Sequence, residues 1–383
     1  AAINKALIAL RRNGGGPVHI NHVTTYDKDF SVTELPKVKG IRFTESLKHM
    51  PELSKNKKIA ILVGTHARWT NELTQLVEEF CENYNAVVLT NHSCNYKGKY
   101  GVNHALMINM LDYVSPNLDA DIIINFGSIT RYVSGIRNRE CEMWRVCPHG
   151  DVWDFERKLT HVFQMSEEDF FEYYVKEAKK DKGFVEHTLV QALQKEYHEI
   201  MKQVPEVPFS NVFAAKNTIG KLPDDCVLHI AGANTARSWN FFELPKGVEC
   251  YSNDGTMGID GQVSALVGES LAAPKRLHFG VVGDLTFFYD MNSIGNHHIR
   301  NNLRLMVVNN GVGAEFKIYS HPAYQWGEEG DSYMAARGHY GNRSSELLKH
   351  YAQDLGYEYL SASTKEEFLK KVERFVTPEF TDK

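Results

Sequence analysis

The 383-residue chain lacks several features that would assign it to a specialised class of protein. It has no apolar run close to the ~20 residues that a membrane-spanning helix needs. Its six cysteines form no C-x-x-C pair, and Cys226 and Cys250 lie in strand-like segments, where we expect reduced core thiols. The formal net charge is −5, so no basic excess indicates nucleic acid. We therefore expect a soluble, cytoplasmic protein that binds a small molecule, with no nucleic-acid or membrane partner.

Apolar runs of strand length alternate with helical segments over most of the chain. Such alternation is typical of parallel sheets whose two faces are covered by helices. Two prolines at 205–208 interrupt the pattern. We predict an α/β protein with two doubly wound parallel-sheet domains. The expected strands are 57–64, 86–90, 121–127, 226–230, 249–252, 276–282, 303–308 and 357–360, and the expected helices include 71–84, 234–242, 259–271, 288–299, 344–355 and 365–375.

Three further segments have less regular patterns. Residues 1–10 predict a helix, followed by a loop and a strand at 18–20. Residues 167–201 are helical and rich in Lys and Glu, which favours a solvated face beside a linker. Residues 64–68 lack the spaced glycines of a nucleotide-binding loop, so we expect them to serve packing.

Polar side chains follow two of the predicted strands at the point where each strand ends. Asp284 comes after the strand 276–282 and Gly283, and Asn310 lies 26 positions further on, after the strand 303–308. If these strands are parallel neighbours joined by a crossover helix, both side chains reach one crevice. One carboxylate and one amide suit Mg²⁺, which takes about six oxygen ligands and often includes phosphates among them. The pattern predicts a diphosphate held through a divalent ion.

The order Gly283-Asp284, helix, Asn309-Asn310 resembles the thiamine-diphosphate (ThDP) motif of 2-keto acid decarboxylases and acetolactate synthases. Residues 283–287 and 258–261 most resemble the menaquinone-pathway carboligases of that family, the SEPHCHC synthase branch. The resemblance implies a ThDP- and Mg²⁺-dependent enzyme that decarboxylates a 2-keto acid and then ligates or protonates the product. It also implies a homodimer or homotetramer, because the family's site lies between two subunits.

The resemblance assigns the metal and diphosphate contacts to particular residues. Asp284, Asn310 and the backbone carbonyl of Val312 would hold Mg²⁺. The amides around Leu285 and Thr286 would face the diphosphate at a helix N-terminus. The Thr286 hydroxyl would either donate to a phosphate or act as an ordinary helix N-cap.

The remaining cofactor contacts would come from Gly283 and from the segment that follows the strand 249–252. Asn253 and Gly255 would face the same crevice, and Met257 would either lie beneath the bend between the two cofactor rings or be ordinary core. The menaquinone branch commonly has an Arg, which meets an acidic substrate, where Asp254 stands here. Acetolactate-synthase-like and decarboxylase substrates therefore stay open.

The resemblance also divides the chain into three parts. Residues 1–35 would be the C-terminal end of a pyrimidine-binding domain plus a linker, 36–205 a central Rossmann-like domain, and 206–383 the ThDP-binding domain. The family's activating Glu belongs to the pyrimidine-binding domain, so no catalytic residue can be named, and we expect no turnover from these 383 residues alone. The alternative is a non-catalytic subunit of the same fold that binds the cofactor or a partner.

Overall fold

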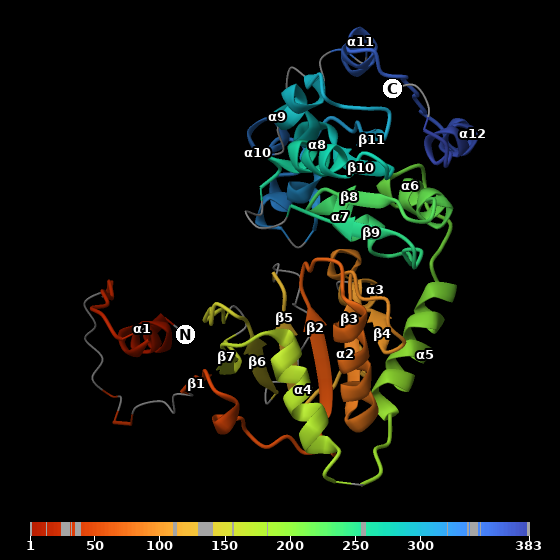
Figure 1. Cartoon of the computed structure of the whole chain (residues 1–383). Coiled ribbons are helices and arrows are strands. Elements are labelled where there is room, and N and C mark those ends of the chain that lie inside the picture. The colour runs from red at the N-terminus through yellow and green to blue at the C-terminus, as the bar shows by residue number, and fades with distance from the viewer. Residues whose placement is uncertain are drawn as a thin grey trace.

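The protein is described by a computed structural model that covers most of the chain. The residues that it describes are 2–12, 14–23, 31, 33–34, 40–109, 113–128, 141–154, 157–181, 183–253, 258–319, 321–334, 337, 344 and 346–380. Their strands form two separate parallel sheets, each with helices on both faces (Figure 1). The predicted fold class, two doubly wound parallel sheets, is confirmed.

The central sheet has the strand order β1-β7-β6-β5-β2-β3-β4, and each neighbouring pair is parallel. Side chains alternate between its two faces, as the pleat requires. One face packs against α2 and α4, and the other against α3 and α5. The bounds are β1 (Arg42–Thr44), β2 (Lys58–Val63), β3 (Asn85–Thr90), β4 (Gly101–Asn103), β5 (Ile122–Phe126), β6 (Glu142–Val146), β7 (Leu159–Phe163), α2 (Asn71–Asn83), α3 (Ala105–Asn109), α4 (Glu167–Ala178) and α5 (Thr188–Lys202), with 3₁₀ turns η1 (Leu47–His49) and η2 (His92–Cys94).

The second sheet has the order β11-β10-β8-β9, again all parallel. Helices α6, α7 and α12 cover one face, and α8, α9 and α11 the other. The bounds are β8 (Val227–Ile230), β9 (Glu249–Tyr251), β10 (His278–Gly283), β11 (Leu303–Val308), α6 (Asn211–Thr218), α7 (Asn234–Trp239), α8 (Gln262–Ala272), α9 (Asp284–Asp290), α10 (Asp331–Met334), α11 (Leu347–Asp354) and α12 (Lys365–Phe375), with 3₁₀ turns η3 (Ile219–Lys221), η4 (Met291–Gly295), η5 (Ala314–Lys317) and η6 (Pro322–Trp326).

The prediction of a solvated face at 167–201 is wrong. The segment forms two helices, α4 and α5, which cover opposite faces of the central sheet. Phe170 and Phe171 of α4 and Leu193 of α5 are fully buried. The charged residues lie between these apolar positions in the sequence, so composition concealed two amphipathic helices that periodicity would have indicated.

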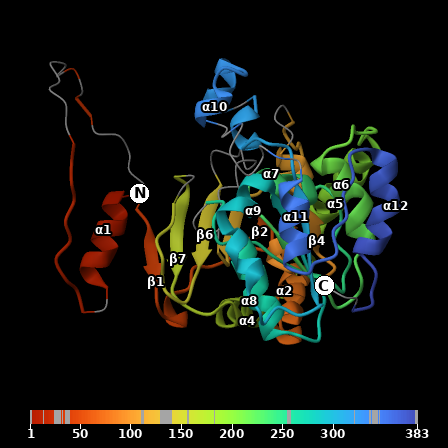
Figure 2. The same ribbon diagram turned by 90° about the horizontal axis from the view of Figure 1, so that it is seen from above.

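Several smaller predictions are also wrong. Residues 18–20 and 357–360 form no strand, and 297–298 lie in a turn after η4 instead of in a helix. A strand needs a neighbour for its backbone hydrogen bonds, and neither segment lies beside one among the described residues. Conversely, the sequence pattern of residues 28–50 predicts a linker, and this segment contains β1. The helix expected at residues 1–10 is confirmed as α1 (Ala2–Arg11), which buries no residue and lies beyond the β1 edge of the central sheet (Figures 1 and 2).

Polar contacts join the two sheets near η2. Asn95, in the left-handed conformation with φ 56°, donates from Nδ2 to the Cys250 carbonyl at 2.9 Å and accepts from the Cys250 amide at 2.8 Å. The His92 amide donates to Asn240 Oδ1 at 2.7 Å, and His92 Nε2 lies 2.7 Å from the Phe242 carbonyl. The end of β3 in the central sheet is thereby fixed against edge strand β9 of the second sheet.

Candidate functional site

The direction in which successive strands are added to the second sheet reverses between β8 and β10. From β8 the chain adds β9 on one side, then returns through α8 to add β10 on the other side. Open α/β sheets bind ligands at such a point, outside the carboxyl ends of the strands. In the second sheet this carboxyl-terminal edge is formed by the residues that follow β8, β9, β10 and β11.

Asp284 lies at this edge and is 1% exposed. Its strand β10 pairs in parallel with β11, and the register joins Gly283 to Val308, so both strands end at the same level. Asp284 Oδ2 accepts a hydrogen bond from the Gly311 amide at 2.8 Å, and Oδ1 accepts one from the Leu285 amide at 2.9 Å. The predicted juxtaposition of the two strand ends is therefore confirmed, and the loop after β11 is attached directly to the carboxylate.

The loop after β11 presents further oxygen atoms beside Asp284. Gly311 has φ 75°, a left-handed conformation that favours glycine, and this turn directs its amide to the carboxylate. Asn310 is exposed, and its Oδ1 accepts from the Val312 amide at 3.2 Å. The described residues contain no group of three His, Cys, Asp or Glu side chains placed to hold a metal. A metal at this edge would therefore combine one carboxylate with amide, carbonyl and ligand oxygens, a set suited to Mg²⁺.

The start of α9 shows which predicted diphosphate contacts are available. The Leu285 amide is already bonded to Asp284 Oδ1, so that donor is engaged. Gly283 is the N-cap residue of α9 and makes no side-chain cap bond, so the N-cap alternative for Thr286 is wrong. A Cβ at Gly283 would lie 3.9 Å from Thr286 Oγ1. Because Gly283 has no side chain, it does not cover the Thr286 hydroxyl.

Asn253 follows β9, which is separated from β10 by β8. Gln262 Nε2 donates to the Asn253 carbonyl at 2.9 Å. Gly261 has φ 74°, a conformation that favours glycine, and a Cβ there would lie 2.9 Å from Asn253 Nδ2 and would displace that side-chain amide. The segment between Asn253 and the start of α8 contains Gly255 and Met257, whose predicted contacts lie outside the described residues.

Sequence reasoning missed two features of this edge. Ala233 follows β8 with φ 59° and ψ −126°, a region where residues other than glycine are strained. Arg237 of α7 forms a two-point ion pair with Glu315 of η5, in which Nη2 donates to Oε1 at 2.9 Å and Nη1 donates to Oε2. These partners are 78 positions apart, and no local pattern indicated their pairing.

The corresponding edge of the central sheet is closed by backbone. Thr65 and Ser128 follow β2 and β5 and exchange two backbone hydrogen bonds of 2.7 and 2.9 Å. Gly127 has φ 74°, and a Cβ there would lie 2.9 Å from the Thr65 carbonyl oxygen. These backbone contacts join the ends of β2 and β5, in agreement with the packing role predicted for 64–68.

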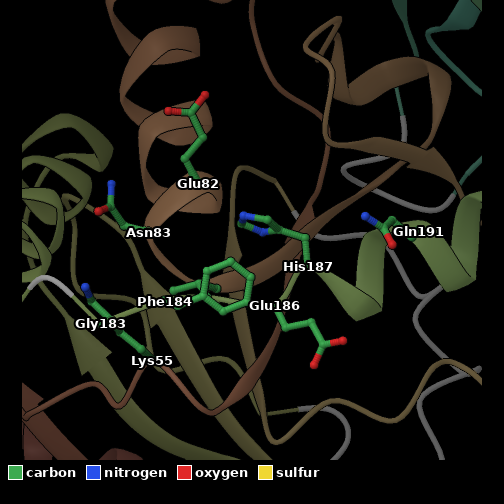
Figure 3. Close-up of a pocket in the computed structure, with 9 residues that line it drawn as sticks. Lys55, Glu82, Asn83, Gly183, Phe184, Glu186, His187 and Gln191 are labelled. Atoms are coloured by element: carbon green, nitrogen blue, oxygen red, sulfur yellow. The ribbon is translucent and has the colours of Figure 1, made fainter.

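A surface hollow of about 560 Å³ lies between the end of α2 and the connection from α4 to α5 (Figure 3). Lys55, Glu82, Phe184 and His187 are among its lining residues. Phe184 is 90% exposed, and charges of both signs surround it. None of the residues predicted to bind a cofactor lines this hollow, so we place the candidate site at the edge that carries Asp284.

No described helix combines the length and apolar character needed to cross a membrane. No protein-family model matches the chain. Curated proteins do match it: relatives from Bacteroides fragilis and Bacteroides thetaiotaomicron are each 28% identical over 98% of this chain and 68% of their own length. A relative from Christiangramia forsetii is 31% identical over 47% of this chain and 30% of its own.

All three relatives are named 2-succinyl-5-enolpyruvyl-6-hydroxy-3-cyclohexene-1-carboxylate (SEPHCHC) synthase. The two Bacteroides matches run through both sheets, so the similarity is not confined to the Gly283-Asp284 motif. SEPHCHC synthases are ThDP-dependent enzymes. This similarity over nearly the whole chain supports the thiamine-diphosphate-dependent enzyme family, in the branch of the SEPHCHC synthases.

Proposed function

We propose that this chain carries the diphosphate- and metal-binding part of a ThDP- and Mg²⁺-dependent enzyme that decarboxylates a 2-keto acid and ligates the product. The observation that carries the proposal is the hydrogen bond from the Gly311 amide to the buried Asp284 carboxylate. This bond holds the Asn310 loop beside the carboxylate at the edge where doubly wound sheets bind ligands.

The residues present fit the cofactor. The Asp284 carboxylate accepts amide hydrogen bonds at both oxygens, of 2.9 Å at Oδ1 and 2.8 Å at Oδ2, which fixes its orientation at the strand ends. Asp284, Asn310 Oδ1 and the Val312 carbonyl would hold Mg²⁺, and the cation would offset the buried negative charge. Asn253, Gly283 and Thr286 would bind or admit the diphosphate and its ring system. ThDP, when bound, supplies the carbanion chemistry, and the protein supplies position and charge.

The substrate would be an acidic 2-keto acid such as 2-oxoglutarate, by analogy with the SEPHCHC synthases. Arg237 is a cation beside this edge, and its side chain is 25% exposed. Because Glu315 occupies its guanidinium, a substrate carboxylate would bind there only by displacing Glu315. An acetolactate-synthase-like substrate without a second carboxylate would leave the ion pair intact.

The complete site would be shared between two subunits of a homodimer or homotetramer. The match covers 68% of the length of the Bacteroides relatives. A cytoplasmic location is proposed on the same analogy.

The test is a calorimetric titration of ThDP with Mg²⁺ and with EDTA, followed by measurement of CO₂ release from 2-oxoglutarate and from pyruvate. We expect ThDP binding that requires Mg²⁺, both for this chain and for the chain fused to the part of a Bacteroides relative that the match leaves out, and turnover of 2-oxoglutarate by the fused protein. Absence of metal-dependent binding in both proteins would contradict the proposal and favour a non-catalytic subunit. Preference for pyruvate would favour the acetolactate-synthase-like reaction.

A further inference from the structure

Two polar side chains are buried side by side in the central sheet, away from the candidate ThDP site. Asn125 of β5 is 0% exposed and Arg145 of the neighbouring strand β6 is 8% exposed. The register pairs these two residues directly. By alternation they share the face of Ile123 and Met143, which packs against α5. They lie near the carboxyl ends of their strands, so this face ends in polar groups.

No described carboxylate forms an ion pair with the Arg145 guanidinium, although the charges of Asp151 and Glu167 act on it from a greater distance. Its Nη1 donates to Asn125 Oδ1 at 3.4 Å, a long contact, and the Cys147 thiol is a second neutral neighbour. Arg145 Nε and Asn125 Nδ2 are buried and have no hydrogen-bond partner among the described residues. Burial lowers the pKa of the guanidinium, and the nearby Cys147, Asp151 and Glu167 offset only part of that effect.

A second cation borders the same strand ends. Arg12 donates from Nε to Gln164 Oε1 at 3.1 Å and from Nη1 to the Gly150 carbonyl at 3.1 Å. Its guanidinium also lies over the Phe43 ring, 5.3 Å from the ring centre. These partners are neutral, like those of Arg145. The carboxyl ends of β6 and β7 therefore combine two guanidinium groups with uncharged acceptors.

A buried charge without a counterion is costly, so such groups are normally paired. We propose that Arg145 and Asn125 form a binding site for the oxyanion group of a small molecule, a carboxylate or a phosphate. The unpartnered Nε–H and amide N–H groups are the donors that a two-oxygen anion accepts, and Arg is suited to bind such groups at two points. Arg12 adds positive potential at the same strand ends. The site is independent of the proposed ThDP function.

The test uses the full chain and a substitution that builds the counterion into the protein. Thermal unfolding and calorimetry compare formate and inorganic phosphate with chloride at equal ionic strength. We expect the wild-type chain to be stabilised by one or both oxyanions but not by chloride. Asn125→Asp is nearly isosteric and would place a carboxylate beside Arg145. It should raise the unfolding temperature in chloride and weaken oxyanion binding by about tenfold or more, because the cation is already paired.

Asn301→Asp is the matched control, since Asn301 lies in an exposed turn of the other sheet's domain. It makes the same change of charge and should leave the oxyanion response intact. Arg145→Met should abolish the response if the variant folds. An equal response of the wild-type chain to chloride would overturn the proposal, as would an Asn125→Asp protein that binds oxyanions as tightly as the wild type. A preference for formate or phosphate would identify the carboxylate or phosphate source, respectively.

Discussion

Replacing Asp284 by Asn tests the metal assignment with almost no change in shape. The carboxylate accepts two amide hydrogen bonds, of 2.9 and 2.8 Å, and is 1% exposed. An Asn side chain has one acceptor oxygen, so the Leu285 or the Gly311 amide loses its partner. Hydrogen bonds to charged groups contribute about 1.5–3 kcal/mol, and removing a buried charge offsets part of the loss. Without cofactor we expect a destabilisation of about 1–2 kcal/mol.

The effect on ligand binding should be larger. A ligand present at about 100 times its Kd stabilises a protein by roughly 2.7 kcal/mol, equivalent to about 5–10 °C in a domain of this size. The wild-type chain should show this shift with ThDP and Mg²⁺ together, and Asp284→Asn should not, because the one carboxylate ligand is lost. Asp354→Asn, at an exposed position of α11, is the control and should keep the shift.

Differential scanning calorimetry of the three proteins, with and without Mg²⁺, gives both quantities. Circular dichroism before heating establishes that the Asp284→Asn variant is folded. If the wild type shows a metal-dependent shift and the variant shows an equal one, Asp284 is not a metal ligand and the reasoning fails.

Three other perturbations address the rest of the chain. Asn95→Ala removes both hydrogen bonds to Cys250, so we expect the free energy of unfolding to fall by about 2–3 kcal/mol and the two sheets to unfold separately in calorimetry. Asn95→Gly, which keeps the backbone conformation, should have the same effect, and a single unchanged transition would contradict this. Burial lowers the pKa of His92 to about 4, below its usual value, so the unfolded chain binds the proton more readily and stability should fall by roughly 3 kcal/mol as pH drops from 6.5 towards 4. His92→Gln should make the midpoint of urea unfolding depend less steeply on pH, and the buried His104 should account for the dependence that remains. An unaltered slope would show that His92 does not cause the loss of stability. Ala233→Gly should stabilise the chain by about 1 kcal/mol, since relief of strain exceeds the entropy cost of glycine, and a lower unfolding temperature would show that the conformation is not strained.

The strand ends at Asp284 and Asn310 were predictable because their signal is local. Each follows a β-branched apolar run, and the intervening length suits a crossover helix, so the sequence itself indicates adjacent parallel strands. The metal and cofactor roles of these residues rest on the family resemblance and stay predictions. The comparisons with known proteins support the family.

The missed features depend on contacts or conformations that local patterns do not encode. Strand β6 carries Glu142 and Arg145 among its five residues, so its polarity concealed a buried strand. The Arg237–Glu315 pair joins distant segments and becomes visible only when α7 and η5 are placed in space. The dihedral angles of Ala233 follow from the sharp exit from β8, whereas the sequence shows an ordinary alanine.

Asn95 also affects whether one copy of the protein can pair with another through strand β9. In a parallel strand, alternate residues direct their backbone groups to opposite sides, and the Glu249 amide donates inwards to the Cys226 carbonyl. Cys250 is therefore the residue of β9 that directs its amide and carbonyl outwards, and Asn95 engages both. An exposed sheet edge can recruit a foreign strand and begin aggregation. Here one side chain from another domain covers that edge, so the contact that fixes the domains also protects the second sheet against intermolecular strand addition.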